Sequence, residues 1–165
     1  NAGVIRPALL PDVNLDDFDY LSALHVGAAM ILAQAALPAM KASGFGRIVN
    51  ISSRAALGLA TRSSYSATKA ALLGLTRTWA LELAQFGITA NAIAPGPVET
   101  DQFHELIPAD SPKKAQVAAA VPVGRLGTPD DVAHAAAFLM AEESGFITGQ
   151  TLYVCGGTSV GSLIL

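Results

Sequence analysis

Apolar residues recur at helical spacing along residues 14–42, which predicts the first long helix of the chain. Asn14 is a suitable N-cap residue, because its side chain can accept a hydrogen bond from an early backbone N–H. Asp16 and Asp17 fit the first turn, where the helix dipole favours negative charge. Pro38 is expected to end or bend this helix, since proline lacks a backbone N–H.

A second long helix is predicted over residues 63–86, and Gly87 is expected to end it. The leucines of this segment occupy more than one stripe of the helix surface, and the first helix is equally apolar on several faces. A helix with one apolar stripe needs only one packing partner. We therefore expect each long helix to pack on a sheet with one side and on a second subunit with the other.

Three short apolar runs, residues 47–52, 88–94 and 152–154, have the length of buried strands. They alternate with helical segments, the last of which covers residues 128–141. Alternation at this spacing predicts parallel strands joined by right-handed crossovers, and hence an α/β layered fold. Residues 98–127 carry prolines and glycines at several breaks, so they are expected to form an irregular loop with short helical pieces.

The chain is rich in apolar residues, but these residues are not gathered into one long run. Of 165 residues, 52% are apolar and only 14% are charged, and the mean hydropathy is +0.44. The length suits one domain. The longest uninterrupted apolar run, residues 26–33, has eight residues, whereas a membrane span needs about 20. Burial against partner subunits is the better explanation, and we predict a homo-oligomer, a dimer or tetramer built through the two long helices.

Charge and cysteine content exclude several other classes. The net charge is −3 and the ten basic residues are scattered, so no nucleic-acid partner is expected. The first residues lack the basic and apolar segments of a secretory signal. Cys155 is the single cysteine, which excludes an internal disulfide and fits a reducing compartment. These features favour a cytoplasmic protein with no membrane partner and no metal site.

The pair Tyr65 and Lys69 is the strongest candidate for chemistry. Residues four apart share one face of a helix, and an ammonium beside a phenol lowers the pKa of the phenol. Such a tyrosine can give a proton to a carbonyl oxygen or take one from an alcohol. Ser52 and Ser53 follow a predicted parallel strand, where ligands of open α/β sheets bind. Tyr-x-x-x-Lys alone is also an ordinary surface pair, but these features occur together and in order.

Six sequence motifs identify a family resemblance that covers the whole chain. They are residues 1–3 (Asn-Ala-Gly), 46–53 (Gly-Arg-Ile-Val-Asn-Ile-Ser-Ser), 65–70 (Tyr-Ser-Ala-Thr-Lys-Ala), 91–100 (Asn-Ala-Ile-Ala-Pro-Gly-Pro-Val-Glu-Thr), 124–129 (Gly-Arg-Leu-Gly-Thr-Pro), and 149–152 (Gly-Gln-Thr-Leu) with the glycines at 156 and 157. With them the chain resembles the short-chain dehydrogenase/reductase family, in particular its members similar to 3-oxoacyl-acyl-carrier-protein reductase.

The resemblance implies a doubly wound, Rossmann-like parallel sheet and an oxidoreductase. Such an enzyme moves hydride between NAD or NADP and a carbonyl or secondary alcohol, of the ketone or 3-oxoacyl thioester type. Tyr65 would be the acid/base, and Lys69 would lower its pKa and bind the nicotinamide ribose. The other implied cofactor-binding residues are Asn1 and Gly3 along the adenosine side and Pro95, Gly96, Val98 and Thr100 around the nicotinamide.

A serine that orients the substrate carbonyl is also implied, and two residues compete for this role. The usual spacing of thirteen residues before the tyrosine indicates Ser52, whereas the position within the strand motif indicates Ser53. We prefer Ser53, because strand register fixes side-chain direction and loops absorb deletions.

Two departures from the family pattern matter. His25 occupies the position of an asparagine that passes protons in many members, so it is either a proton relay or a packed histidine. The glycine-rich phosphate loop and the strand–helix units around it are absent, about 80 to 90 residues at roughly 30 per unit. Residues 1–165 are therefore expected to be the C-terminal part of a single domain that is inactive alone and exposes a sheet edge.

Residues 98–127 correspond to the segment that covers the substrate, and Phe103, His104, Leu106 and Ile107 offer it a mostly apolar lining. This lining suits a medium-sized ketone, alcohol or acyl thioester. The apolar tail, residues 158–165, suggests a subunit contact. The alternative to an enzyme is a catalytically inactive relative that acts as a binding or regulatory module.

Overall fold

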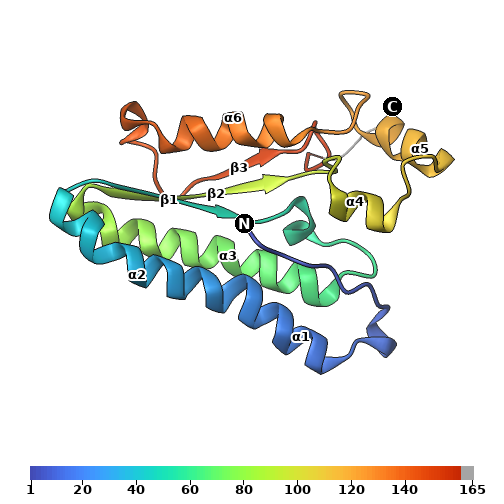
Figure 1. Cartoon of the computed structure of the whole chain (residues 1–165), viewed down its shortest axis with the longest axis horizontal. Helices are drawn as coiled ribbons and strands as arrows, with labels where there is room; N and C mark the ends of the chain where they lie inside the picture. The colour runs from blue at the N-terminus through green and yellow to red at the C-terminus, as the bar shows by residue number, and fades with distance from the viewer. Residues whose placement is uncertain (161–165) are drawn as a thin grey trace.

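The computed structural model describes residues 1–160 and contains the predicted three-stranded parallel sheet. Its strands, β1 (Gly46–Ile51), β2 (Ile88–Pro95) and β3 (Thr151–Val154), lie in the order β1-β2-β3. In the register, Gly46 is opposite Ile88, and Ala92 is opposite Thr151. The α/β fold with parallel strands is thus confirmed. The central strand β2 is buried from its first residue to Ala94, because helices cover both faces of the sheet (Figure 1).

One face of the sheet is covered by two long helical segments. The first comprises α1 (Leu15–Ser22), a π-helical turn η2 (Ala23–Gly27) and α2 (Ala28–Ser43), and the second is α3 (Ser63–Leu83), which continues as the 3₁₀ turn η4 (Ala84–Phe86). Asn14 caps α1 as predicted, by accepting the backbone N–H of Asp16. Gly87 ends the second segment with a φ of 71°, a left-handed conformation that glycine adopts at little cost.

Pro38 was expected to end or bend the first helix, and the first of these two alternatives is wrong. Pro38 lies inside α2, and the helix continues to Ser43 before Gly44 ends it with a left-handed backbone. Pro38 is exposed, so the carbonyl one turn earlier that loses its N–H partner can be hydrated. Solvation of the freed carbonyl reduces the cost of proline inside a helix.

The opposite face of the sheet is covered by α6 (Pro129–Met140), which is followed by η5 (Glu142–Ser144). Thr128 and Asp131 form a capping box at the start of α6, which satisfies two backbone donors at once. The predicted loop of residues 98–127 contains α4 (Asp101–Leu106) and α5 (Pro112–Ala120), as expected of short helical pieces. Both lie beyond the carboxyl ends of the strands (Figure 1).

The N-terminal residues approach the same end of the sheet through an extended segment and η1 (Leu10–Asp12). A further 3₁₀ turn, η3 (Arg54–Leu57), follows β1 directly. The carboxyl ends of the strands, the start of α3, η3 and α4 therefore surround one region. The predicted contact through the apolar tail involves residues 161–165, which lie outside the described residues.

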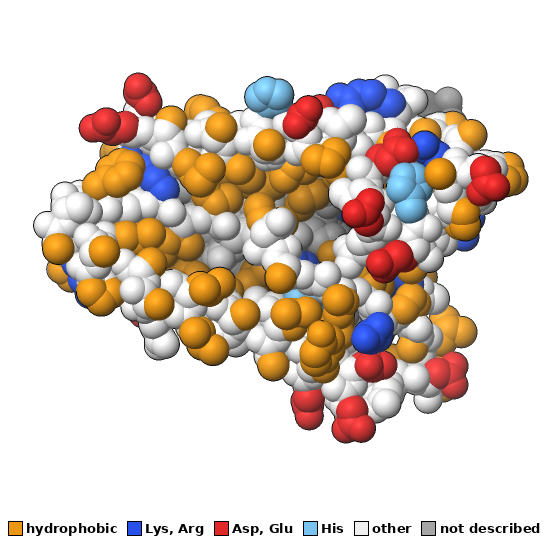
Figure 2. Space-filling model, in the orientation of Figure 1, with side chains coloured by type: hydrophobic (Ala, Val, Ile, Leu, Met, Phe, Trp, Pro, Cys, Tyr) orange, Lys and Arg blue, Asp and Glu red, His pale blue; other side chains and the backbone are white. Residues whose placement is uncertain are grey.

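The segment Leu15–Ser43 is long and apolar enough to cross a membrane by length and composition alone, and it is largely uncovered. Its large exposed apolar residues are Leu15, Phe18, Tyr20, Met30, Ile31 and Leu32. Figure 2 shows apolar side chains gathered over α1 and α2 and in the hollow between these helices and α6. One such helix is weak evidence for a membrane span. This surface instead agrees with the expectation that the long helices need a further packing partner.

Candidate active site

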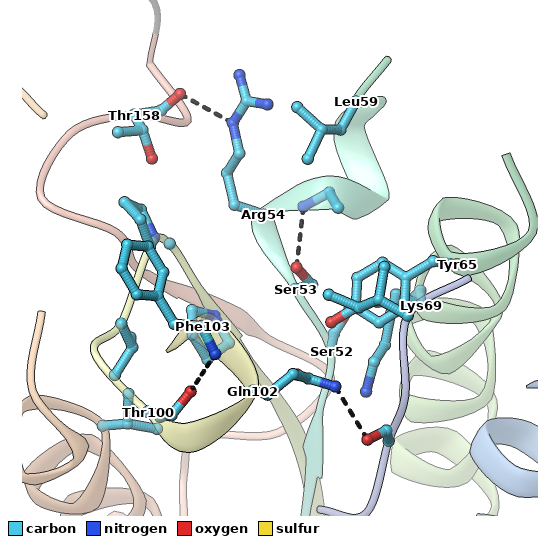
Figure 3. Close-up of a pocket in the computed structure, with 18 of the residues that line it drawn as sticks. Ser52, Ser53, Arg54, Leu59, Tyr65, Lys69, Thr100, Gln102, Phe103 and Thr158 are labelled. Carbon is cyan, nitrogen blue, oxygen red and sulfur yellow. Dashed lines mark hydrogen bonds between the residues drawn. The ribbon is translucent and has the colours of Figure 1, made fainter. Parts of the chain in front are cut away.

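The predicted site residues, which come from four separate parts of the chain, line a single cavity of about 870 Å³. They are Asn1, Gly3, Ser53, Tyr65, Lys69, Pro95, Gly96, Val98 and Thr100. The cavity lies at the carboxyl ends of β1 and β2, where ligands bind in open α/β sheets. Figure 3 shows Ser53, Tyr65 and Lys69 together on one side of it, with Phe103 facing them from α4.

The two adjacent serines have different surroundings. Ser52 is only 3% exposed, and its hydroxyl donates a 2.7 Å hydrogen bond to the backbone carbonyl of Lys69. The Ser53 hydroxyl accepts the backbone N–H of Ala55 at 3.1 Å and lies beside the side chain of Tyr65, close enough to lower the pKa of the phenol. Since successive residues of a strand point to opposite sides, only the second serine directs its hydroxyl at the phenol.

Tyr65 and Lys69 share one face of α3, and the Lys69 Nζ lies 5.7 Å from the centroid of the Tyr65 ring. The ammonium donates a 2.9 Å hydrogen bond to the carbonyl of Ile51, at the end of β1. Burial lowers the pKa of Lys69 to about 8. The positive charge of Lys69 therefore lies at the carboxyl edge of the sheet, because α3 carries the side chain there and the Ile51 carbonyl binds its ammonium group.

The pKa of Tyr65 differs from the expectation. Burial raises this pKa above its ordinary value, while the neighbouring Ser53 hydroxyl and the charge of Arg62 act in the opposite direction. The sequence argument considered only the neighbouring ammonium of Lys69, whereas desolvation of the phenolate is the larger effect here. Tyr65 is consequently a neutral phenol, and so a proton donor, at neutral pH.

His25 sits at the centre of the π-helical turn η2 and is 3% exposed. Its Nε2 accepts the backbone N–H of Val4 at 3.2 Å, so Nδ1 carries the proton and donates to Thr68 Oγ1 at 2.8 Å. Thr68 in turn donates to the carbonyl of Tyr65 at 3.0 Å. Burial, with a smaller effect from Lys69, lowers the pKa of His25 to about 4. Both ring nitrogens are engaged, which favours the packed alternative over the relay.

Two glycines of the site leave no room for a side chain. A Cβ on Gly3 would lie 3.1 Å from His25 Nε2, and a Cβ on Gly96 would lie 2.7 Å from the Cα of Cys155. The Gly96 contact is with backbone, which cannot move aside. The carbonyl of Gly3 also accepts a 3.1 Å hydrogen bond from Gln102 of α4. These close contacts bring the N-terminal segment, β2 and α4 to the rim of the same cavity.

The rim formed by α4 and α5 is held by side chains. Thr100 caps α4 by accepting the backbone N–H of Phe103 at 3.2 Å. Glu99 forms an ion pair with Lys114 of α5, and its Oε1 lies 3.3 Å from Nε2 of His104 in α4. The hydrogen bond with Lys114 is the main reason that the pKa of Glu99 is lowered. Glu99 thus ties the two short helices that cover the cavity to each other.

Sequence reasoning missed four polar residues of the cavity lining: Arg54, Arg62, Gln102 and Thr158. They lie at the start of η3, just before α3, in α4 and after β3, where no periodic pattern indicates direction. The only available signal was position, since Arg54 follows Ser53 and Arg62 lies three residues before Tyr65.

A parallel sheet covered by helices on both faces, with a cavity at its carboxyl edge, is the arrangement of Rossmann-like α/β proteins, which bind ligands at that edge. The family profile described as enoyl-(acyl carrier protein) reductase matches residues 1–159. The chain is 42% identical over 162 residues to a subunit of (2S)-[(R)-hydroxy(phenyl)methyl]succinyl-CoA dehydrogenase from Thauera aromatica, which covers 97% of this chain and 63% of that protein. It is 38% identical to a 3-oxoacyl-[acyl-carrier-protein] reductase from Rickettsia bellii, over 95% of this chain and 64% of the relative.

Solved structures agree with this relationship. A gluconate 5-dehydrogenase from Burkholderia cenocepacia, in complex with NADP and tartrate, matches with a TM-score of 0.90 and 36% identity, over 98% of this chain and 64% of that one. A short chain dehydrogenase/reductase family protein matches with a TM-score of 0.88 and 38% identity, over 98% of this chain and 66% of that one. The chain belongs to the short-chain dehydrogenase/reductase family, as the sequence motifs indicated. It spans somewhat less than two thirds of the length of these curated relatives.

Proposed function

We propose that the protein containing this chain transfers hydride between NAD or NADP and a carbonyl or secondary alcohol, with Tyr65 as the acid/base. The observation that carries this proposal is the meeting of the Tyr65, Ser53 and Lys69 side chains in one cavity at the carboxyl edge of the sheet. In the reducing direction, the carbonyl carbon would receive hydride from a dinucleotide bound in this cavity.

Two of the three side chains then act on the carbonyl oxygen, and the third, Lys69, acts on Tyr65. Tyr65, a neutral phenol, gives its proton to the oxygen as negative charge develops there. The Ser53 hydroxyl, already directed at the phenol, holds the same oxygen by a hydrogen bond. Lys69 supplies a positive charge that stabilises the phenolate left behind. Proton and hydride together convert the ketone to the alcohol, and the reverse steps oxidise the alcohol.

The nicotinamide end of the cofactor fits the residues that surround the cavity. Gly96 allows close backbone approach between the ends of β2 and β3, and Gly3 lies close against the side chains of His25 and Lys69. We assign Asn1 and Gly3 to the adenosine side, with Pro95, Gly96, Val98 and Thr100 bordering the nicotinamide. Relatives of solved structure bind NADP, which supports a dinucleotide here. The form, NAD or NADP, is left open in this proposal.

The substrate is proposed to be a ketone, or a 3-oxoacyl thioester, with an apolar body. The cavity lining near Tyr65 includes the apolar side chains of Leu59, Phe103, Leu106 and Val117. Relatives named for 3-oxoacyl-acyl-carrier-protein and for a substituted succinyl-coenzyme A act on carbonyl or alcohol groups near a thioester. An apolar lining with a few convergent polar groups is the usual form of such a site.

We further propose that the protein is a cytoplasmic homo-oligomer, joined through α2 and α3. The exposed apolar residues of the Leu15–Ser43 segment support this assembly. Light scattering of the complete protein tests it, and a monomer at micromolar concentration would contradict the assembly.

The activity is tested by following nicotinamide absorbance with a panel of ketones in the complete protein. Tyr65→Phe is expected to lower kcat about 10²- to 10⁴-fold, as removal of a general acid does, with circular dichroism unchanged. An unaltered rate in the variant would refute the acid/base role. Dinucleotide binding without turnover of any ketone would favour the inactive binding module instead. The isolated 165-residue chain is expected to be inactive.

A further inference from the structure

Three cationic side chains line the cavity, those of Arg54, Arg62 and Lys69. Within residues 1–160, no Asp or Glu lines it, although the chain as a whole has a net charge of −3. In the same range, none of the three cations forms a salt bridge. A cavity of this charge attracts anions, and its low-dielectric walls strengthen the attraction.

Arg54 is positioned by backbone carbonyls alone. Its Nε donates to the carbonyl of Thr158 at 3.1 Å, and its Nη1 donates to the carbonyl of Gly58 at 3.2 Å. Nη2 has no hydrogen-bond partner in the described part of the chain, so the guanidinium is oriented without being neutralised. Figure 3 shows it at the rim, on the far side of Ser53 from Lys69 and beside Leu59. An oriented guanidinium with free donors is suited to bind a carboxylate.

Arg62 is positioned by a strained residue. Its Nη1 donates to Thr61 Oγ1 at 2.6 Å and to the Thr61 carbonyl at 3.3 Å, and that carbonyl also accepts the N–H of Ala8. Thr61 has a φ of 65°, the only positive φ of a non-glycine residue in the described chain. This conformation is unfavourable for a β-branched residue and persists only where its surroundings hold it, often at functional sites. Arg62 is close enough to Tyr65 to lower its pKa.

The proposed reaction uses Lys69 but neither arginine. Arg54 is the residue after Ser53, and consecutive Cα atoms are about 3.8 Å apart. Arg62 precedes Tyr65 by less than one helical turn. Both arginines line the same cavity as Ser53 and Tyr65, and the charge of Arg62 is close enough to Tyr65 to lower its pKa. An anion that pairs with these arginines inside the cavity belongs to the substrate close to its carbonyl, because the phosphates of a coenzyme A carrier are separated from that point by the pantetheine arm.

We propose that Arg54 and Arg62 form a subsite for a carboxylate of the substrate, a few bonds from the reacting carbonyl. This inference rests on the proposed function and narrows its substrate class from ketones to oxo acids. The substrate carboxylate would pair with the two arginines, which form no salt bridge within residues 1–160. The apolar side chains of the cavity would contact the rest of the substrate.

Three forms of one substrate test the subsite in the complete protein with saturating reduced dinucleotide. They are 4-oxo-4-phenylbutanoate, its methyl ester and its coenzyme A thioester. The carboxylate is expected to have a kcat/KM about tenfold or more above that of the ester, since a hydrogen-bonded charge pair of this kind is lost in the ester. Arg54→Gln and Arg62→Gln should each remove about tenfold from the carboxylate, mainly through KM. The ester should lose less in both variants, although Arg62→Gln also affects ester turnover because Arg62 lowers the pKa of Tyr65.

Two control variants separate recognition from structure. Arg54→Lys keeps the charge and should retain part of the preference for the carboxylate. Arg77→Gln removes an exposed arginine of α3 outside the cavity lining and should leave the preference intact. Equal losses for carboxylate and ester in Arg54→Gln and Arg62→Gln would mean a structural role and overturn the proposal. An arginine dependence confined to the thioester would assign the anion to the carrier phosphates and overturn the carboxylate assignment.

Calorimetry with the oxidised dinucleotide bound provides a readout that does not need turnover. The carboxylate should bind more tightly than the ester, and Arg54→Gln should remove the difference. Tight carboxylate binding without turnover would refute the proposed function while supporting the subsite. Equal binding of carboxylate and ester would refute the subsite, whether or not ketones are reduced.

Discussion

The His25 Nδ1 lies 2.8 Å from Thr68 Oγ1, and this bond joins the first long helix to the helix that carries Tyr65 and Lys69. The other ring nitrogen of His25, Nε2, accepts a hydrogen bond from the backbone N–H of Val4. One neutral imidazole therefore connects the N-terminal segment, η2 and α3, with the tautomer fixed by its two partners.

His25 is expected to make the protein acid-sensitive. Its pKa is about 4 in the folded protein, mainly through burial, and near 6.5 when unfolded. The unfolded chain thus binds the proton first, and stability falls as pH decreases from about 6.5 to 4, by about 3 kcal/mol in total. Urea denaturation of wild type and His25→Asn at several pH values measures this. Parallel pH profiles for the two proteins would show that another group is responsible.

Ser52 and Ser53 are expected to respond differently to replacement by alanine. Ser53→Ala should lower kcat about 10²-fold with little change in stability, because the hydroxyl acts on the reacting oxygen. Ser52→Ala should cost about 1 to 3 kcal/mol in stability, since the buried Lys69 carbonyl loses its hydrogen bond from Oγ. Steady-state kinetics and urea midpoints on both variants check this. A larger kinetic loss in Ser52→Ala at full folding would reverse the assignment.

Lys69 is expected to limit activity at alkaline pH. Its lowered pKa of about 8 means that the ammonium is charged below this pH and loses its proton as pH rises through it, well below the 10.5 of a free lysine. If the charge stabilises the Tyr65 phenolate, kcat/KM should fall above pH 8. Lys69→Arg should shift that decline upward, since a guanidinium stays charged. An identical alkaline limb in the arginine variant, with measurable activity, would point to a different group.

Gly96 is expected to tolerate no side chain. In Gly96→Ala the new Cβ would meet the Cα of Cys155 at 2.7 Å, and the strain should cost about 1 to 3 kcal/mol or more and weaken dinucleotide binding. Gly74→Ala is the matched control, because a Cβ there has no neighbour within 4 Å and α3 should gain about 0.5 to 1 kcal/mol. Thermal melts and dinucleotide titrations compare the two. Similar melting temperatures would contradict the crowding at Gly96.

The order of elements, the parallel sheet, the shared helix face of Tyr65 and Lys69 and the place of Gly96 at a strand end could all be read from the sequence alone. These follow from local information: hydrophobic period fixes element type, an i, i+4 spacing fixes a shared helix face, and Pro-Gly-Pro ends a strand. The hydrogen bond of Ser52 to the backbone of α3 and the raised pKa of Tyr65 became evident only from the three-dimensional packing. These properties depend on burial and on contacts between residues far apart in the chain. The sequence pattern of one segment does not show which other segment packs against it.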